Sequence, residues 1–361
     1  MAELEVCPEC SVPIYLTTEN IWLDNGDVVQ ARAQANRLAL IECENLDPLF
    51  EGIGQIIGLP IEPIVVEAVR RNMRRYLRQF VTDEMRDRIM AGELDPTEVD
   101  KAFMATAILT GYGRYEVVES RFERDGDDFH TVKVSEPFSV PMCAGSHCAA
   151  MEAILGYDHA VTYAQLDEQT YEIKAYPSPQ PRAFVDRLHT QRYRPRPGDL
   201  ELERCPTCGG PKALSVCAWY LSRGIIVNKP LKRRMALVGP AELDPIFAEL
   251  EDELGEMIPQ IVVEAQRRFA KTGFYNMQEV ENEGDFRIQL ALRGLGNLRE
   301  LKINKRGLHL LVENAALPMI IVGMMQGIFE MAFDMETDLE WEMSRGNLRV
   351  ELTPKDVSVS V

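Results

Sequence analysis

An internal duplication constrains the fold of this chain more than any other feature of its sequence. The segment 46–71 (LDPLFEGIGQIIGLPIEPIVVEAVRR) recurs at 243–268 (LDPIFAELEDELGEMIPQIVVEAQRR), with half of its positions identical. The repeat extends outwards, because Cys-Pro-Glu-Cys at 7–10 has a counterpart in Cys-Pro-Thr-Cys at 205–208. Self-similarity over this length predicts two copies of one structural unit.

A charged stretch rich in proline separates the two copies. Residues 176–203 hold five prolines among many charged side chains, which is the composition of an extended linker. We therefore expect five segments: an N-terminal zinc-knuckle β segment (1–45), a first α+β repeat (46–176), a Pro-rich linker (177–204), a second zinc-knuckle β segment (205–242) and a second α+β repeat (243–361).

The order of elements within each copy indicates the α+β class. Short alternating stretches after the Cys pair, such as 14–18 and 38–42, predict small antiparallel strands. Asp47 and Asp244 are predicted N-caps, each followed by a proline at the first helical position. A basic amphipathic helix, a strand pair, an apolar helix and a closing hairpin come next. We expect two tandem α+β units, each an antiparallel sheet with helices and each preceded by a small zinc-ribbon-like β segment.

One face of the predicted helix at 61–80 is strongly basic. Arg70, Arg74 and Arg78 follow one another at a spacing of four residues, which places them on one side of a helix. We expect a solvated face that pairs with the many carboxylates of the chain. A phosphate-bearing ligand or an acidic partner is the alternative interpretation.

The charge balance excludes several classes of partner. The 361 residues include 39 Lys and Arg against 57 Asp and Glu, a net charge of -18. Long-range repulsion at this charge opposes nucleic acid and anionic membrane surfaces. The first nine residues already hold three glutamates, and the apolar run 314–329 is short for a membrane span. We expect a cytoplasmic protein with neither nucleic acid nor membrane as its partner.

The two Cys-Pro-x-Cys pairs carry the strongest chemical signal. Each forms a tight knuckle with two thiolates on one side, which is half of a tetrahedral zinc site. Neither copy supplies a second knuckle of its own, so we expect the two knuckles to face each other and share one structural Zn²⁺. A redox dithiol and a knuckle without metal are the alternatives. The predicted ligands are Cys7, Cys10, Cys205 and Cys208.

A family resemblance rests on four parts of the first copy. They are the basic amphipathic helix at 61–80, the strand pair Tyr115-Glu-Val-Val-Glu and Phe129-His-Thr-Val-Lys-Val, the apolar helix that contains Ala144-Gly-Ser-His-Cys-Ala-Ala-Met, and the hairpin after it. In this order they resemble the 4-vinyl reductase type domain of predicted hydrocarbon-binding proteins, phenol-responsive regulators and a bacteriochlorophyll biosynthesis accessory factor. The resemblance covers roughly 46–176, and 243–353 in shorter form. The hairpin 161–177 contains no Cys, so the zinc site that members often carry there is not carried over.

The resemblance implies a pocket for a small apolar molecule between the apolar helix and the sheet of the first copy. Cys143, His147 and Cys148 lie together at the start of that helix, where core packing is the alternative to a second metal or a haem contact. The expected lining is Tyr115, Phe129, Met142, Cys143, His147, Cys148, Met151, Ile154, Leu155 and Tyr163.

No motif assembles a nucleophile, a base and a group that orients the base. We therefore expect non-catalytic binding of a small hydrophobic molecule by a sensor, carrier or accessory factor. In this protein a structural zinc ion would join the two copies. The alternatives are an enzyme or enzyme accessory factor that uses Cys143, His147 and Cys148 beside the pocket, and a structural assembly subunit. A protein partner or a second copy of the chain stays open.

Overall fold

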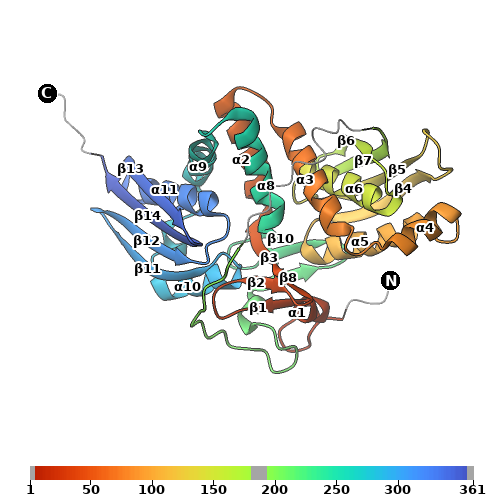
Figure 1. Cartoon of the computed structure of the whole chain (residues 1–361). Coiled ribbons are helices and arrows are strands. Elements are labelled where there is room, and N and C mark those ends of the chain that lie inside the picture. The colour runs from red at the N-terminus through yellow and green to blue at the C-terminus, as the bar shows by residue number, and fades with distance from the viewer. Residues whose placement is uncertain (1–4, 180–192, 356–361) are drawn as a thin grey trace.

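The central layer of the molecule is a six-stranded antiparallel sheet built from both copies of the repeat. A computed structural model describes residues 5–179 and 193–355 of the chain. Figure 1 shows this sheet beneath the two helices at the middle of the molecule, α2 (Cys43–Ile57) and α8 (Pro240–Leu254). Its strands, in spatial order, are β1 (Asn20–Trp22), β2 (Val28–Gln30), β3 (Ala33–Glu42), β10 (Arg233–Val238), β9 (Ile225–Asn228) and β8 (Cys217–Tyr220).

The two copies meet at the pairing of β3 with β10. Leu40 is the register partner of Leu237, and the two leucines occupy equivalent positions of the repeat. On either side, Ala39 pairs with Val238 and Ile41 with Ala236, as a twofold relation requires. A pseudo-twofold axis therefore passes through the Leu40–Leu237 pair.

Each copy forms one lobe beside the central sheet. The four-stranded antiparallel sheets of the two lobes have the same strand order, β4-β5-β7-β6 and β11-β12-β14-β13. The first lobe contains α3 (Glu62–Leu77), α4 (Asp83–Ala91), α5 (Pro96–Thr110), β4 (Arg114–Arg121), β5 (Phe129–Ser135), α6 (Val140–Leu155), β6 (His159–Asp167) and β7 (Thr170–Pro177). The second lobe contains α9 (Ile258–Phe269), η2 (Ala270–Phe274), η3 (Met277–Glu279), α10 (Glu283–Leu292), β11 (Asn297–Asn304), β12 (Gly307–Glu313), α11 (Pro318–Phe333), β13 (Thr337–Ser344) and β14 (Asn347–Pro354).

The repeated sequence thus specifies repeated structure, and the predicted α+β class is confirmed. The shared Ile-Val-Val-Glu-Ala segments lie on helices of the same type, α3 and α9. The predicted linker at 177–204 lies partly outside the described residues. Among the described residues, every helix is too short or too polar to cross a membrane.

The two central helices are exchanged between the lobes. Helix α2 belongs to the first copy by sequence but packs against α9 of the second lobe, while α8 packs against α3 of the first lobe (Figure 1). A Cβ atom on Gly52 of α2 would lie 3.3 Å from the Ala265 Cβ of α9. Arg71 of α3 and Glu249 of α8 form a buried ion pair at 2.7 Å. Each lobe is therefore completed by a helix from the other copy.

Glycine lets the apolar helix of each lobe approach the basic helix closely. A Cβ on Gly145 of α6 would lie 2.6 Å from the Val66 carbonyl oxygen of α3. In the second lobe, a Cβ on Gly323 of α11 would lie 2.4 Å from the Val263 carbonyl oxygen of α9. Distances below 3.0 Å leave no room for a Cβ atom, so glycine at these two positions lets the helices approach this closely.

The predicted start of the LDP helices is wrong by about one turn. Helix α2 begins directly after β3, at Cys43, which leaves Pro48 inside the helix. Asp47 is therefore no N-cap of its own helix. Its Oδ2 instead accepts the backbone N–H of Val140 at 3.1 Å, at the first residue of α6. This contact between distant segments has no signature in local sequence.

Two further expectations are corrected. The stretch expected to form a strand at 14–18 is a short helix, α1 (Ile14–Glu19), in which the Thr17 and Thr18 hydroxyls donate to the Ile14 carbonyl. The basic face of α3 pairs with carboxylates as expected, and Arg78 at its C-terminal end is exposed, but the start of the face is not solvated. Arg70 is 1% exposed because α6 covers it and supplies the partner Glu152.

Candidate metal centre and apolar cleft

The two Cys knuckles have the same backbone geometry. In the first, the Cys7 N–H donates to the Val12 carbonyl at 2.8 Å, and Ser11 has a left-handed φ of 61°. In the second, the Cys205 N–H donates to the Gly210 carbonyl at 2.8 Å, with Gly209 at a φ of 74° in the place of Ser11. The turn in each knuckle directs both of its thiols to one side.

The structure brings all four predicted cysteines together. The Cys7 Sγ lies 3.7 Å from the Cys205 Sγ, and the Cys10 Sγ lies 3.5 Å from the Cys208 Sγ. All four sulfur atoms lie within 4.8 Å of one another. Zn–S bonds of about 2.3 Å in a tetrahedron place the sulfurs about 3.8 Å apart. The cluster, which we call the Cys₄ cluster, therefore has the size of a tetrahedral metal site.

Backbone amides and burial shape the chemistry of these thiols. The backbone N–H of Cys10 is hydrogen-bonded to the Cys7 sulfur and lowers the pKa of Cys7 to about 7. Burial raises the pKa of Cys10 to about 12. Outside the cluster, the Thr207 hydroxyl donates to Glu9 at 2.9 Å, which joins the two knuckles once more. A metal ion bound here would link segments that are 198 residues apart in the chain.

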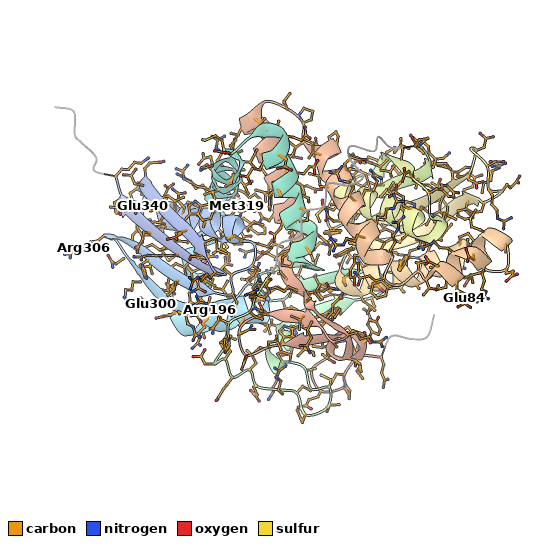
Figure 2. The ribbon with its side chains drawn as sticks, in the orientation of Figure 1. Glu84, Arg196, Glu300, Arg306, Met319 and Glu340 are labelled. Atoms are coloured by element: carbon orange, nitrogen blue, oxygen red, sulfur yellow. The ribbon has the colours of Figure 1, made fainter. Side chains whose placement is uncertain are left out.

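A cleft runs from the first lobe past the central helix α8 to the start of α11 in the second lobe. It has a volume of about 1800 Å³, and residues of both copies line it. Arg196 and Met319 lie on its wall near the middle of the molecule, whereas Glu84 and Glu340 lie toward opposite ends (Figure 2). Apolar side chains of its wall include Met73, Leu94, Val99, Phe103, Ala107 and Phe247.

Of the ten residues expected to line a pocket, only Tyr115 and His147 lie on this cleft. The helix α6 is apolar around its circumference because it lies between α3 and the sheet of its lobe, so its side chains fill the first core. Phe129 instead contacts Lys174, and Tyr163 is exposed on β6. The remaining expected residues are buried in the lobe: Met142, Cys143, Cys148, Met151, Ile154 and Leu155.

A partly buried carboxyl group from the second copy meets the first lobe in the cleft. Glu242 of α8 accepts a hydrogen bond from the Tyr112 hydroxyl at 3.2 Å and from the Gly239 backbone N–H at 3.0 Å. Burial raises the pKa of Glu242 to about 7. The cleft therefore contains a group that is readily protonated near neutral pH.

Sequence reasoning missed the polar residues of the cleft. Tyr112 and Glu242 come from different copies, and Asp100 lies among charged residues of α5 that resemble an ordinary helix surface. No local motif marks them, because only the packing of α8 against the first lobe brings them together.

Comparison with known proteins gives little further guidance. No family model and no curated protein matches the chain. Among solved structures, the chain is similar to a mutant of T. tengcongensis H-NOX (17% identity, 32% of this chain, 74% of that chain, TM-score 0.23). It is also similar to a Cs H-NOX mutant with an unnatural amino acid (18% identity, 34% and 77% coverage, TM-score 0.25). A third structure, from a study of H-NOX activation, gives 19% identity, 32% and 72% coverage and a TM-score of 0.23. Likeness at this level assigns neither a fold family nor a ligand.

Proposed function

We propose that this protein binds a small hydrophobic molecule in the cleft, without transforming it, and that structural zinc in the Cys₄ cluster holds its two copies together. The observation that carries the proposal is the cleft itself, whose walls are mostly apolar and come from both copies. Ligand sites are concave and mostly apolar, with a few polar groups that fix orientation. The cleft exceeds the usual 300–1000 Å³, so a small ligand would occupy only part of it.

The part of the cleft near α5 and α6 suits such a ligand best. Apolar side chains such as Phe103 and Met104 stand there beside the polar groups of Tyr112, Tyr115 and His147. The apolar part of a ligand can pack against Phe103 and Met104, while a single polar group of the ligand contacts one of the polar side chains. This combination supports a role as a sensor, carrier or accessory factor.

Zinc is the metal that the Cys₄ cluster favours. Four thiolates with no open position are typical of structural zinc, which adds its binding free energy to folding. The cluster joins the two chain segments that precede β1 and β8, the edge strands of the central sheet, so the bound ion would hold these segments together.

The proposal includes membership of the 4-vinyl reductase type family, with a ligand site displaced from the one that the resemblance implies. The alternative of an enzyme that uses Cys143 and Cys148 receives no support from their environment. Both thiols are fully buried, and burial raises the pKa of Cys143 to about 12. A thiol in this state is a poor nucleophile, because the thiolate is the reactive form.

A cleft-filling variant tests the proposal. Ala107 lies on the wall of the cleft in α5, and Ala107→Trp would fill the space beside it. Ala164→Trp on the exposed strand β6 adds the same side chain outside the cleft and serves as control. We expect the neutral apolar probe 1-aminoanthracene to bind the wild-type protein and the control with equal affinity, and Ala107→Trp at least about tenfold more weakly.

Equal binding to all three proteins would place the probe elsewhere and overturn the cleft as the ligand site. Native mass spectrometry of protein purified without chelator gives the complementary readout. We expect one zinc ion per Cys₄ cluster together with any co-purified apolar molecule. Circular dichroism of each variant confirms that it folds.

A further inference from the structure

Three buried titratable side chains meet behind the cleft, on elements that are far apart in sequence. Asp100 lies on α5, His130 on β5 and His147 on α6, and one ligand atom from each lies within 4.8 Å of the others. The Asp100 Oδ2 is 3.7 Å from the His130 Nε2. The His147 Nε2 is 3.4 Å from the His130 Nδ1 and 3.3 Å from the His130 carbonyl oxygen. We call this group the DHH cluster.

Two polar atoms of the DHH cluster have no hydrogen-bond partner among the described residues. The Asp100 Oδ2 and the His130 Nε2 are both buried and accept or donate no hydrogen bond. Their residues are 2% and 1% exposed. A buried polar group without a partner costs free energy, and native proteins rarely retain one without a reason. A cation held between these atoms would satisfy both.

The second lobe shows that the fold does not need these polar groups. Strands β5 and β12 have equal length, as do helices α6 and α11, so His130 corresponds to Leu308 and His147 to Met325. Leu308 and Met325 are buried and apolar. The same architecture therefore packs with hydrocarbon at both positions, and the histidines of the first lobe serve another purpose.

We propose that the DHH cluster binds one divalent transition-metal ion. Two imidazoles and one carboxylate form a donor set that suits zinc and iron in their divalent states. Asp100 and His147 also line the cleft, which leaves an open coordination side toward it. That a cleft ligand occupies this side, through one oxygen or nitrogen donor, rests on the proposed function; the metal site does not.

The protonation states of the cluster agree with this assignment. Burial lowers the pKa of His130 to about 4 and that of His147 to about 3, so both imidazoles have a free lone pair at neutral pH. Burial also raises the pKa of Asp100 to about 7.

Cobalt titration of the metal-free protein tests the site, with Co²⁺ alone as the probe. We expect the wild-type chain to bind two Co²⁺ ions with distinct spectra. The ion in the Cys₄ cluster gives intense thiolate charge-transfer bands, whereas the ion in the DHH cluster gives only weak ligand-field bands. Asp100→Asn and His130→Gln should each remove the second ion and leave the thiolate bands unchanged.

The matched control is His309→Gln. His309 is the histidine of the second lobe that lies between two carboxylates, Glu300 and Glu351, but it is partly exposed on the sheet surface. We expect two Co²⁺ ions in this variant. A single Co²⁺ per wild-type chain, or a second ion retained by Asp100→Asn, would overturn the proposal even if His130→Gln failed to fold. Binding of 1-aminoanthracene is measured on the wild-type chain and on Ala107→Trp, so the two proposals fail separately.

Discussion

The Arg70 Nη1 lies 2.7 Å from the Glu152 Oε1, and both side chains are buried between α3 and α6. The second lobe repeats the pair, with the Arg267 Nη2 2.7 Å from the Glu330 Oε2. In each lobe the glutamate also accepts the backbone N–H of the first residue of the closing hairpin, His159 at 2.9 Å and Thr337 at 3.1 Å. A buried ion pair thus fastens helix to helix and helix to sheet.

Glu152→Ala should destabilise the protein strongly. It leaves the buried Arg70 guanidinium without its buried partner, which costs about 3–5 kcal/mol of unfolding free energy. Glu67 is the second carboxylate that contacts Arg70, and its side chain is 39% exposed. Glu67→Ala should therefore lower the unfolding free energy by less than about 1 kcal/mol. Urea denaturation measures both. Equal losses would contradict the assigned role of the buried pair.

Gly145→Ala should separate α3 from α6. The new Cβ would lie 2.6 Å from the Val66 carbonyl oxygen and 2.9 Å from the Val69 Cβ, so a helix must shift. Overpacking of this kind costs about 1–3 kcal/mol. Gly126→Ala, where nothing lies within 4 Å, is the control and should be close to neutral. Thermal unfolding followed by circular dichroism would detect the difference.

Glu242 should make stability depend on pH. Its pKa is raised from 4.5 to about 7 by burial, so the folded state retains a proton that the unfolded state releases. The stabilising contribution is present below pH 4.5 and is lost as the pH rises through about 7. We expect the unfolding free energy of the wild-type protein, relative to Glu242→Gln, to fall over this range. A difference between the two proteins that does not change with pH would refute the prediction.

Cys205→Ser should affect both knuckles. Loss of one ligand from a shared site removes the metal, and structural zinc in small domains contributes about 10–16 kcal/mol. We expect one metal ion fewer per chain and faster proteolysis at the first knuckle as well as at the second. Thr207→Ala, beside the site, should retain the metal. Proteolysis confined to the second knuckle would show that the two do not share an ion.

Features that depend on residues close together in the sequence could be predicted. The repeat, the α+β class and the set of four cysteines follow from patterns within short segments, such as the spacing of Cys7 and Cys10. The exchange of α2 and α8 was not predictable, because equivalent core positions allow either helix to complete either lobe. Asp47 illustrates the same limit: its local pattern is that of an N-cap, yet its carboxylate caps α6.

The same distinction applies to the site residues: one cluster was predictable from the sequence and the other was not. The Cys₄ cluster combines two local motifs, so the sequence contained it. The DHH cluster takes one residue from each of three elements, and the pattern around Asp100 is that of a solvated helix surface. The sequence analysis assigned residues of α6 such as Met151 and Ile154 to a pocket, because an apolar helix must be shielded from water. In the structure they are shielded by the protein core rather than by an open cleft.

The exchange of the central helices means that the repeat in the sequence is not the unit that can exist alone. A chain cut between residues 179 and 193 would yield two fragments, each lacking the helix that covers its own lobe and carrying the helix that covers the other. Neither fragment would be complete when expressed by itself. Expressed together, the two fragments would form a complete protein, because each supplies the central helix that the other fragment's lobe lacks.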